Sequence, residues 1–286
     1  MSTVIYIDVV RNKKKLIWGL IYTAAFLLAC FVLSAIFDLV FPGINSIFDF
    51  PQAIDSFLLF YDWNEHLYIN IWNLFVFVFP FIFIYVLMLD YSCSIVEEEE
   101  FETLTYMRSL GIGRETLLIS KLLVRLAWVL AVCFVLLVEN LLFFLILGEK
   151  KMIVTAAVFC LKLFLVGILH FTFALFVAAC SAREKSCTIT CGVIVLFEFV
   201  FARLHSYVRL LADTLFVSGK KYNEIEWLYG ISAKLESLKI FCPIKLCYPQ
   251  QSAPLGLGIC IAIMGIVFCV AGFSIYTRDQ VVFRNR

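Results

Sequence analysis

Long, uninterrupted runs of apolar residues are the dominant pattern along this chain. A run of about 20 apolar residues is long enough to form a helix across the hydrocarbon core of a bilayer. About six such runs occur, and they predict an all-α polytopic membrane protein with a single transmembrane domain over residues 1–286. The predicted spans are residues 16–39, 69–88, 126–147, 153–180, 188–204 and 255–276.

The composition strengthens this interpretation. Hydrophobic residues make up 63% of the chain and charged residues only 16%, and the mean hydropathy is +0.98. Soluble domains are roughly half apolar, so a soluble enzyme is excluded. The net charge of +1 gives no electrostatic reason to expect a nucleic acid as partner. Most of the 11 cysteines lie in apolar runs, where a thiol acts as a small hydrophobe, so a disulfide scaffold is not indicated.

The distribution of basic residues predicts the orientation in the membrane. Residues 1–15 contain Arg11, Lys13, Lys14 and Lys15 and are expected to lie in the interface. Cytoplasmic loops carry the excess of Lys and Arg, and an even number of spans returns the C-terminus to the side of the N-terminus. We therefore expect a multi-pass protein of the plasma membrane with both termini in the cytoplasm. The basic residues of the loop before the last span do not follow this rule.

That loop, residues 205–252, is too apolar for a simple linker. It contains four apolar residues at helical spacing: Trp227, Ile231, Leu235 and Leu238. We expect an outer, amphipathic, re-entrant segment that folds back on the membrane, either as a packing element in the interface or as a cap that faces substrate. Cys242 and Cys247 bracket Pro243, and both a local disulfide and two free thiols are compatible with this spacing.

Motifs for catalysis or nucleotide binding are absent from the sequence. No His-Glu-x-x-His pair occurs, and the three histidines His66, His170 and His205 are scattered. Gly219 and Lys220 lack the upstream glycine of a phosphate-binding loop. The chain is therefore predicted to be no enzyme, and no catalytic residue, metal site or cofactor is expected in it.

The segment between the second and third predicted spans, residues 94–113, carries the most specific pattern. Ser94 and Glu97 have the spacing of a capping box, acidic residues follow to position 100, and Arg108 stands near the other end. Gly111 and Gly113 then predict a stop. We expect a short cytoplasmic helix.

This helix would present an apolar stripe of Phe101, Leu104 and Met107 beside its carboxylates. In the following helix, Arg114, Lys121 and Arg125 share one face and are expected to reach the headgroup boundary by snorkelling. The alternative is that the charges form a solvated face that only fixes topology.

The whole segment resembles the permease family of type-2 ABC transporters, in which an acidic Glu-x-x-x-Gly-Thr-Leu helix precedes a Pro-x-Ser-Arg turn and a Gly-Lys-Leu span. Glu99 or Glu100, then Thr103, Leu104, Arg114 and Lys121 match the motif, whereas Glu102 and Ser120 stand where the family has glycine. The resemblance implies ATPase-coupling residues on the cytoplasmic side: Glu97, Glu98, Glu99, Glu100, Phe101, Thr103, Leu104, Met107, Arg108, Arg114 and Lys121.

The same resemblance implies the partners and the activity. A separate ABC ATPase would bind ATP and Mg²⁺, and a second permease copy or a paralogue would complete the path. The substrate would be amphipathic, such as an antimicrobial peptide, a bacteriocin or a drug, and would move outward. The alternative is a non-transporting sensor or assembly protein that docks a partner through the acidic helix. A secondary transporter is disfavoured because the two halves show no internal repeat.

Four ionisable residues lie within predicted spans, where charge is costly in hydrocarbon: Glu139, Lys162, His170 and Glu198. Counting from the turns places Glu139 level with Lys162, and His170 level with Glu198. Each pair could therefore form an intramembrane contact, or each side chain could snorkel or bind a backbone carbonyl instead.

Overall fold

The computed structural model describes residues 2–40, 67–100, 109, 111–181, 183–219, 221–237, 242–247 and 255–278. Within these ranges the chain is almost wholly helical and has no strand, which confirms the predicted all-α polytopic fold. The elements are α1 Ser2–Val40, α3 Leu67–Glu100, α5 Arg114–Leu147, α6 Lys150–Cys180, α7 Glu184–Val217, α8 Tyr222–Ser237, the short 3₁₀ helix η3 Pro243–Cys247, and α9 Leu255–Arg278.

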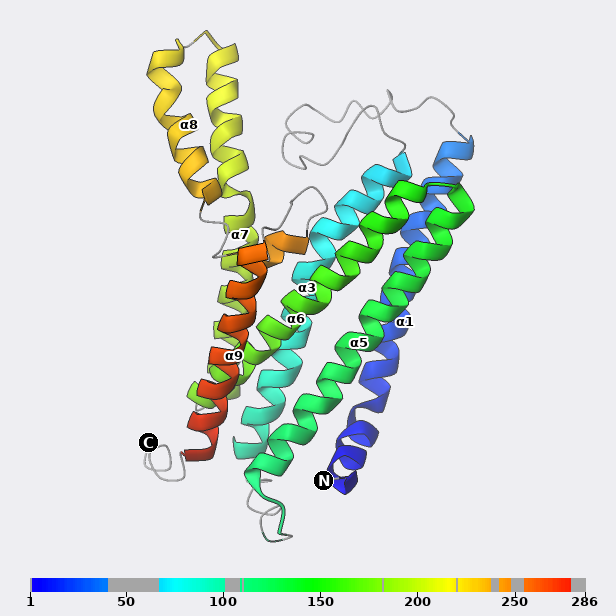
Figure 1. Cartoon of the computed structure of the whole chain (residues 1–286), viewed down its shortest axis with the longest axis vertical. Coiled ribbons are helices and arrows are strands. Elements are labelled where there is room, and N and C mark those ends of the chain that lie inside the picture. The colour runs from blue at the N-terminus through cyan, green and yellow to red at the C-terminus, as the bar shows by residue number, and fades with distance from the viewer. Residues whose placement is uncertain are drawn as a thin grey trace.

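The long helices form one bundle, and α6 is its central member (Figure 1). α6 packs against α9, α5 and α3, whereas α1 packs on the far side of α5 and also touches α3. A helix bonds all its backbone groups within its own segment, which is what an apolar chain requires in lipid. The bundle therefore follows directly from the run lengths in the sequence.

Five helical segments in the described part of the chain are long and apolar enough to cross a membrane: Val78–Glu97, Arg114–Leu147, Lys150–Cys180, Glu184–Val217 and Ile259–Thr277. The first predicted span falls within α1, whose described apolar part, Ile17–Ala29, is shorter. α1 is helical from Ser2 onward, so the basic residues near the N-terminus belong to the same helix as this span. An interfacial position for residues 1–15 stays a prediction.

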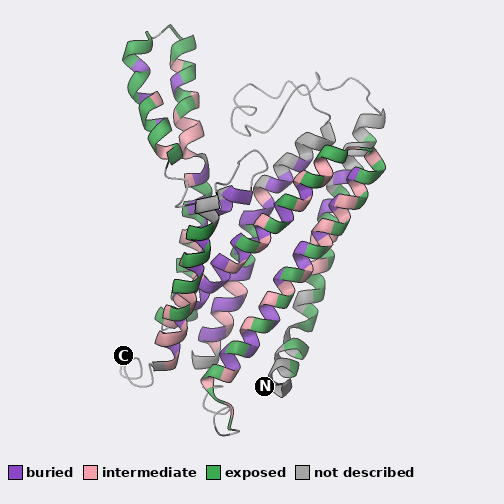
Figure 2. Cartoon of the chain, in the orientation of Figure 1, coloured by how far each residue is buried: buried purple, intermediate pink, exposed green. Residues whose placement is uncertain are grey.

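Buried residues line the inside of the bundle and exposed residues its outside (Figure 2), and large apolar side chains occur in both places. Large buried aromatic side chains fill the inside, among them Trp72, Tyr91, Phe144 and Phe159. On α9, Ile259, Ile263 and Val267 are more than half exposed. In water such a surface would be unstable, whereas in lipid it is the expected outer face of a spanning helix.

α7 and α8 form a hairpin that extends beyond the rest of the bundle (Figure 1). α7 continues through His205 to Val217 because no glycine or proline occurs between Gly192 and Gly219, which adopts a left-handed φ of 95°. Residues 205–217 of the predicted outer segment thus continue helix α7, and its re-entry into the membrane stays a prediction.

α8 packs on this extension of α7 through a face different from the predicted stripe. Ile225 and Leu228 are buried against Ala212, and the Ser232 hydroxyl donates to the carbonyl oxygen of His205 at 2.8 Å. Trp227, by contrast, is 61% exposed. Trp227 and Ile231 of the predicted stripe are therefore exposed, and Leu238 lies outside the described residues.

η3 is buried at the foot of this hairpin and packs on α6, α3 and α7. No disulfide joins Cys242 and Cys247 in the structure. Instead, the Cys242 thiol donates to the carbonyl oxygen of Glu198 at 3.4 Å, which ties the segment before the last span to α7. We call the end of the bundle near this helix the η3 end.

Candidate functional site

The acidic run belongs to the last turns of α3 and does not begin a new helix. The Ser94 hydroxyl donates to the carbonyl oxygen of Tyr91 at 2.8 Å, as serine does in a helix interior. The predicted capping box of Ser94 and Glu97 is therefore wrong. The physical reason is that no glycine or proline separates the apolar part of α3 from Glu100, so the helix continues through the polar residues.

The remainder of the predicted coupling motif lies mostly outside the described residues. This applies to Phe101, Thr103, Leu104, Met107 and Arg108, and to the side chains of Glu98, Glu99 and Glu100, whereas Glu97 is half-buried on α3. The role of these residues in ATPase coupling stays a prediction. The structure does describe both flanks of the segment, the end of α3 and the start of α5.

The start of α5 is joined to the end of α9. Gly111 adopts a left-handed φ of 78°, and Gly113 caps the helix in an extended conformation. Arg114 then donates from Nη1 to the carbonyl oxygen of Tyr276 at 3.2 Å, and its guanidinium lies 5.5 Å from the centre of the Tyr276 ring. One arginine thus fixes where α5 begins relative to α9.

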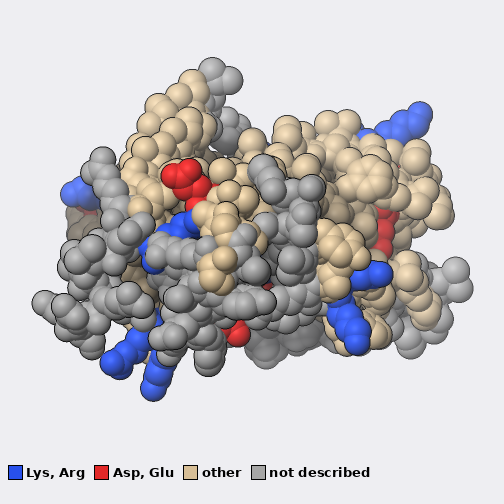
Figure 3. Space-filling model, turned by 90° about the horizontal axis from the view of Figure 1, so that it is seen from below, with Lys and Arg blue, Asp and Glu red and all other residues tan. Residues whose placement is uncertain are grey.

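Two further basic residues of α5 bind the end of α3. Lys121 donates from Nζ to the carbonyl oxygen of Ser94, and Arg125 donates from Nε to the Asp90 carboxylate at 2.8 Å. We call these four residues the α3–α5 clamp. Figure 3 views the molecule from this end, where Lys and Arg side chains lie at several places around the bundle.

The predicted snorkelling of the basic face of α5 is wrong for Lys121 and Arg125. Lys121 is 3% exposed and the Arg125 side chain 0%, so both point into the α3 contact and not toward headgroups. The reason is that Asp90 and the Ser94 carbonyl offer acceptors within the bundle, and a buried cation needs such partners. Sequence reasoning missed Asp90. The sequence did contain a signal for it, because Asp90 is a carboxylate at the end of an apolar run and the next helix carries a basic face.

His170 and Glu198 meet inside the bundle, at the matched depth predicted by the hairpin count. His170 Nε2 lies 2.9 Å from Glu198 Oε1, and Nδ1 lies 2.8 Å from the carbonyl oxygen of Val166. A carbonyl can only accept, so Nδ1 carries a hydrogen. Nε2 and the Glu198 carboxyl therefore share one proton, which gives a pair with zero net charge in the middle of two spans.

Glu139 and Lys162 are not brought together, so the pairing predicted for them is wrong. Glu139 Oε2 is buried without a hydrogen-bond partner in the described residues, whereas Lys162 lines two cavities beside η3 and α9. The two residues do lie on adjacent helices, but Lys162 occupies the side of α6 that faces α9. The depth of a residue in the membrane can be estimated from residue counts, whereas the side of the helix that faces a neighbour cannot.

No group of three or more His, Cys, Asp or Glu side chains that could hold a metal ion occurs among the described residues. The polar contacts described above join different helices, and such contacts hold spans in register.

These features define a polytopic helical membrane protein with a charged, internally linked end. A family model described as ABC-2 family transporter protein matches residues 56–202. Since this match covers more than half of the chain, the protein belongs to the ABC-2 family and is the membrane-spanning permease part of an ABC transporter. Comparison with curated proteins and with solved structures finds no match.

Membership of the family carries two further consequences. Permeases of this family normally have no catalytic function of their own, and the family implies partnership with an ABC ATPase. The matched region covers α3, α5 and α6, and with them both sides of the α3–α5 clamp.

Proposed function

We propose that this chain is the permease subunit of an ABC exporter that moves an amphipathic substrate, such as a peptide, a bacteriocin or a drug, out of the cell. The family match supports the permease role. The outward direction and the substrate class rest on the resemblance of the motif around Thr103, Leu104, Arg114 and Lys121 to exporter permeases of this family. Lipid or polysaccharide export is a remote alternative.

One observation carries the mechanism: the α3–α5 clamp joins the two helices that the predicted coupling segment connects. Residues 101–113 connect α3 to α5, and the two helices are joined again by Lys121 at Ser94 and by Arg125 at Asp90. These part-buried contacts hold the two flanking helices together, so α3 and α5 are expected to move as one unit at this end. A force applied to the segment is therefore passed to α3 and α5 together.

The ATPase would supply that force from the cytoplasmic side. ATP and Mg²⁺ would bind to this partner, with the apolar anchors Phe101, Leu104 and Met107 of the permease seated on it and the surrounding carboxylates steering its approach. A second permease copy or a paralogue would complete the path. We place the clamp end in the cytoplasm of a plasma-membrane protein because α1 begins and α9 ends there, beside exposed Lys13, Lys14 and Arg183.

The test uses the complex of this chain with the ATPase that co-purifies with it. Leu104→Asp should abolish co-purification, or should leave ATP hydrolysis unresponsive to substrate, because it places a charge in the apolar contact. Ile231→Asp is the matched control: Ile231 is exposed on α8, at the other end of the molecule, and the substitution should leave co-purification unchanged.

A second arm separates charge from apolar anchoring. Neutralising Glu98, Glu99 and Glu100 should weaken association most at low salt, since exposed charges are screened as ionic strength rises. If the Leu104→Asp protein still binds its ATPase and still exports, the coupling role is wrong. If the chain binds a partner but no substrate changes ATP turnover, the sensor or assembly function replaces the exporter function.

A further inference from the structure

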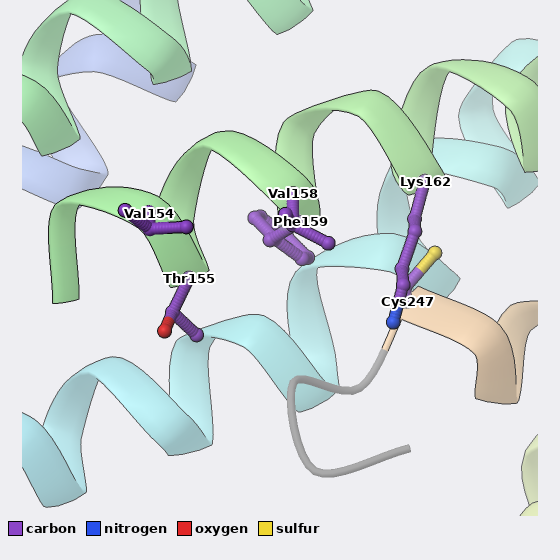
Figure 4. Close-up of a pocket in the computed structure, with 6 residues that line it drawn as sticks. All are labelled: Val154, Thr155, Val158, Phe159, Lys162 and Cys247. Carbon is purple, nitrogen blue, oxygen red and sulfur yellow. The ribbon is translucent and has the colours of Figure 1, made fainter. Parts of the chain in front are cut away.

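Two cavities meet at Lys162, near the η3 end of the bundle. The smaller has a volume of about 170 Å³ and is lined by Val154, Thr155, Val158, Phe159, Lys162 and Cys247. Figure 4 shows the Lys162 side chain extending from α6 to Cys247, with its nitrogen beside the end of η3. Lys162 therefore forms a cationic boundary of this cavity.

The larger cavity continues from the same lysine between α6 and α9. It has a volume of about 410 Å³, and apart from Lys162 and Thr172 its lining is apolar, including Leu165, Val166, Ile261 and Ile266. Val166 and Ile261 are buried and form its floor, whereas Leu165 and Ile266 are 52% and 64% exposed at its mouth. The cavity is thus a groove that opens on the apolar outer surface of the bundle.

We infer that this groove binds one anionic membrane lipid, with its headgroup phosphate at Lys162 and an acyl chain between α6 and α9. The inference concerns a resident lipid of the bilayer and does not depend on the proposed transport function. It follows from three properties of the site: the length of the groove, the reach of the lysine side chain, and the charge at one end.

The length of the groove suits an acyl chain of one leaflet. The α6 residues that line it run from Lys162 to Thr172, a distance of about 15 Å along a helix at 1.5 Å per residue. This is half of a hydrocarbon core of about 30 Å.

The reach of the lysine side chain suits a headgroup. Lys162 stands 12 residues after Lys150, the first residue of α6, and its side chain extends toward Cys247 at the η3 end. A long side chain of this kind carries its ammonium from the hydrocarbon toward the headgroups, where it meets phosphate. The three N–H donors of the ammonium allow it to bind a phosphate oxygen while it keeps a contact with the protein.

The small cavity next to the lysine has room for the polar part of the lipid. The Thr155 hydroxyl donates to the carbonyl oxygen of Lys151 at 3.1 Å, so its oxygen is left to accept from the ligand. A hydroxylated headgroup satisfies this acceptor, and a trimethylammonium headgroup does not. Phosphatidylglycerol, which is anionic and hydroxylated, is therefore the probe of choice, with phosphatidylcholine of identical acyl chains as its comparison.

The experiment titrates the delipidated full chain with each lipid and counts bound molecules by native mass spectrometry. The wild type should retain one phosphatidylglycerol per chain and prefer it over phosphatidylcholine. Lys162→Gln should lower the affinity for phosphatidylglycerol about tenfold, the loss of one charge-assisted contact, and should leave phosphatidylcholine unchanged. Lys162→Arg should retain binding, and Lys151→Gln, one of the basic residues at the exposed start of α6, is the matched control.

A second pair of variants tests the groove itself. Ala262 lines the groove and is exposed, so Ala262→Phe should fill the groove and weaken both lipids without displacing the core. Val267→Phe adds an aromatic ring to the exposed surface of α9 outside the groove lining and should leave retention unchanged. Equal retention of the two lipids, an unchanged Lys162→Gln titration, or an effect of Ala262→Phe on oligomeric state alone would overturn the inference.

Discussion

α9 meets α6 in two different ways at the two ends of the bundle. Near the clamp end, a Cβ on Gly272 would lie 2.9 Å from Leu175 Cγ and 3.0 Å from the Phe176 backbone nitrogen, so the helices are in backbone contact. Seven residues earlier in α9, toward the η3 end, a Cβ on Gly265 would come no closer than 3.6 Å to Thr172 Oγ1, and the groove opens beside it.

The same helix pair is therefore closed at one end and spread at the other. Small residues let spanning helices approach closely, and polar contacts between helices hold the register that results. At the clamp end both devices are present, Gly272 together with the contacts of Arg114, Lys121 and Arg125. The clamp end is therefore the closely packed and polar-linked end of the bundle, whereas the η3 end contains a groove between α6 and α9.

The largest effect is expected from breaking the clamp at Arg125. Arg125→Met removes the cation and leaves the Asp90 carboxylate without its buried partner, which should cost about 3 kcal/mol of unfolding free energy. Thermal denaturation in detergent measures it. The double variant Arg125→Met with Asp90→Leu should recover most of the stability, because it leaves no stranded charge. Additive losses in the double variant would show that the two side chains do not act as a pair.

The next effect tests the comparison itself by making one substitution at two glycines of α9. Gly272→Ala should destabilise the fold by about 1–3 kcal/mol, because its methyl group meets the Phe176 backbone and forces α9 away from α6. Gly265→Ala should be neutral or slightly stabilising, since its methyl group meets only ordinary contacts. Denaturation of the two variants under the same conditions decides the matter, and equal losses would contradict the difference between the ends.

A smaller effect is expected at the proton-sharing pair between the two ends. Glu198→Leu leaves His170 Nε2 buried without a partner and should cost about 1–2 kcal/mol. Glu198→Gln should cost less, because its amide N–H can donate to Nε2 of a neutral imidazole. The order of the two melting temperatures is the measurement. A Gln variant as unstable as the Leu variant would show that a hydrogen-bond donor at position 198 does not stabilise this contact.

The smallest effect lies in the α7–α8 hairpin, outside the bundle. The Tyr229 hydroxyl donates to the Asp213 carboxylate at 2.7 Å, and this hydrogen bond raises the pKa of Tyr229 above its usual value of 10.0. The contact is present while the phenol is protonated, so it stabilises the hairpin at neutral pH and is lost as pH rises through the raised pKa. Fluorescence of the nearby Trp227 should change in that range. Tyr229→Phe should remove the change, and a response that persists in this variant would assign it to another group.

The fold was predictable from the sequence because run length alone decides which segments can span a bilayer. The level positions of His170 and Glu198 followed for the same reason, since helix rise converts residue counts into depth. The rotation of a helix about its axis cannot be obtained from residue counts. This rotation places Lys162 and Glu139 on different sides, and it points Lys121 and Arg125 toward α3 and not toward the headgroups.

Helix ends were the other source of error. Polar residues at the end of an apolar run suggested a stop at Ser94 and a loop after position 204, yet α3 and α7 continue through both positions. Polar residues do not end a helix unless glycine, proline or a competing cap is present. The α7–α8 hairpin was missed because its packed face, Ile225 with Leu228, is shorter than the exposed stripe that includes Trp227.

The central claim, that the ATPase contacts the segment between α3 and α5, is tested most directly by photocrosslinking in native membranes. A photoreactive residue at position 104 should crosslink to the ATPase, and the crosslink should be lost when the ATPase is absent. The same residue at position 227, on the exposed face of α8 at the other end of the molecule, should give no such product. An ATPase crosslink from position 227, or none from position 104 in a complex that hydrolyses ATP, would contradict the account.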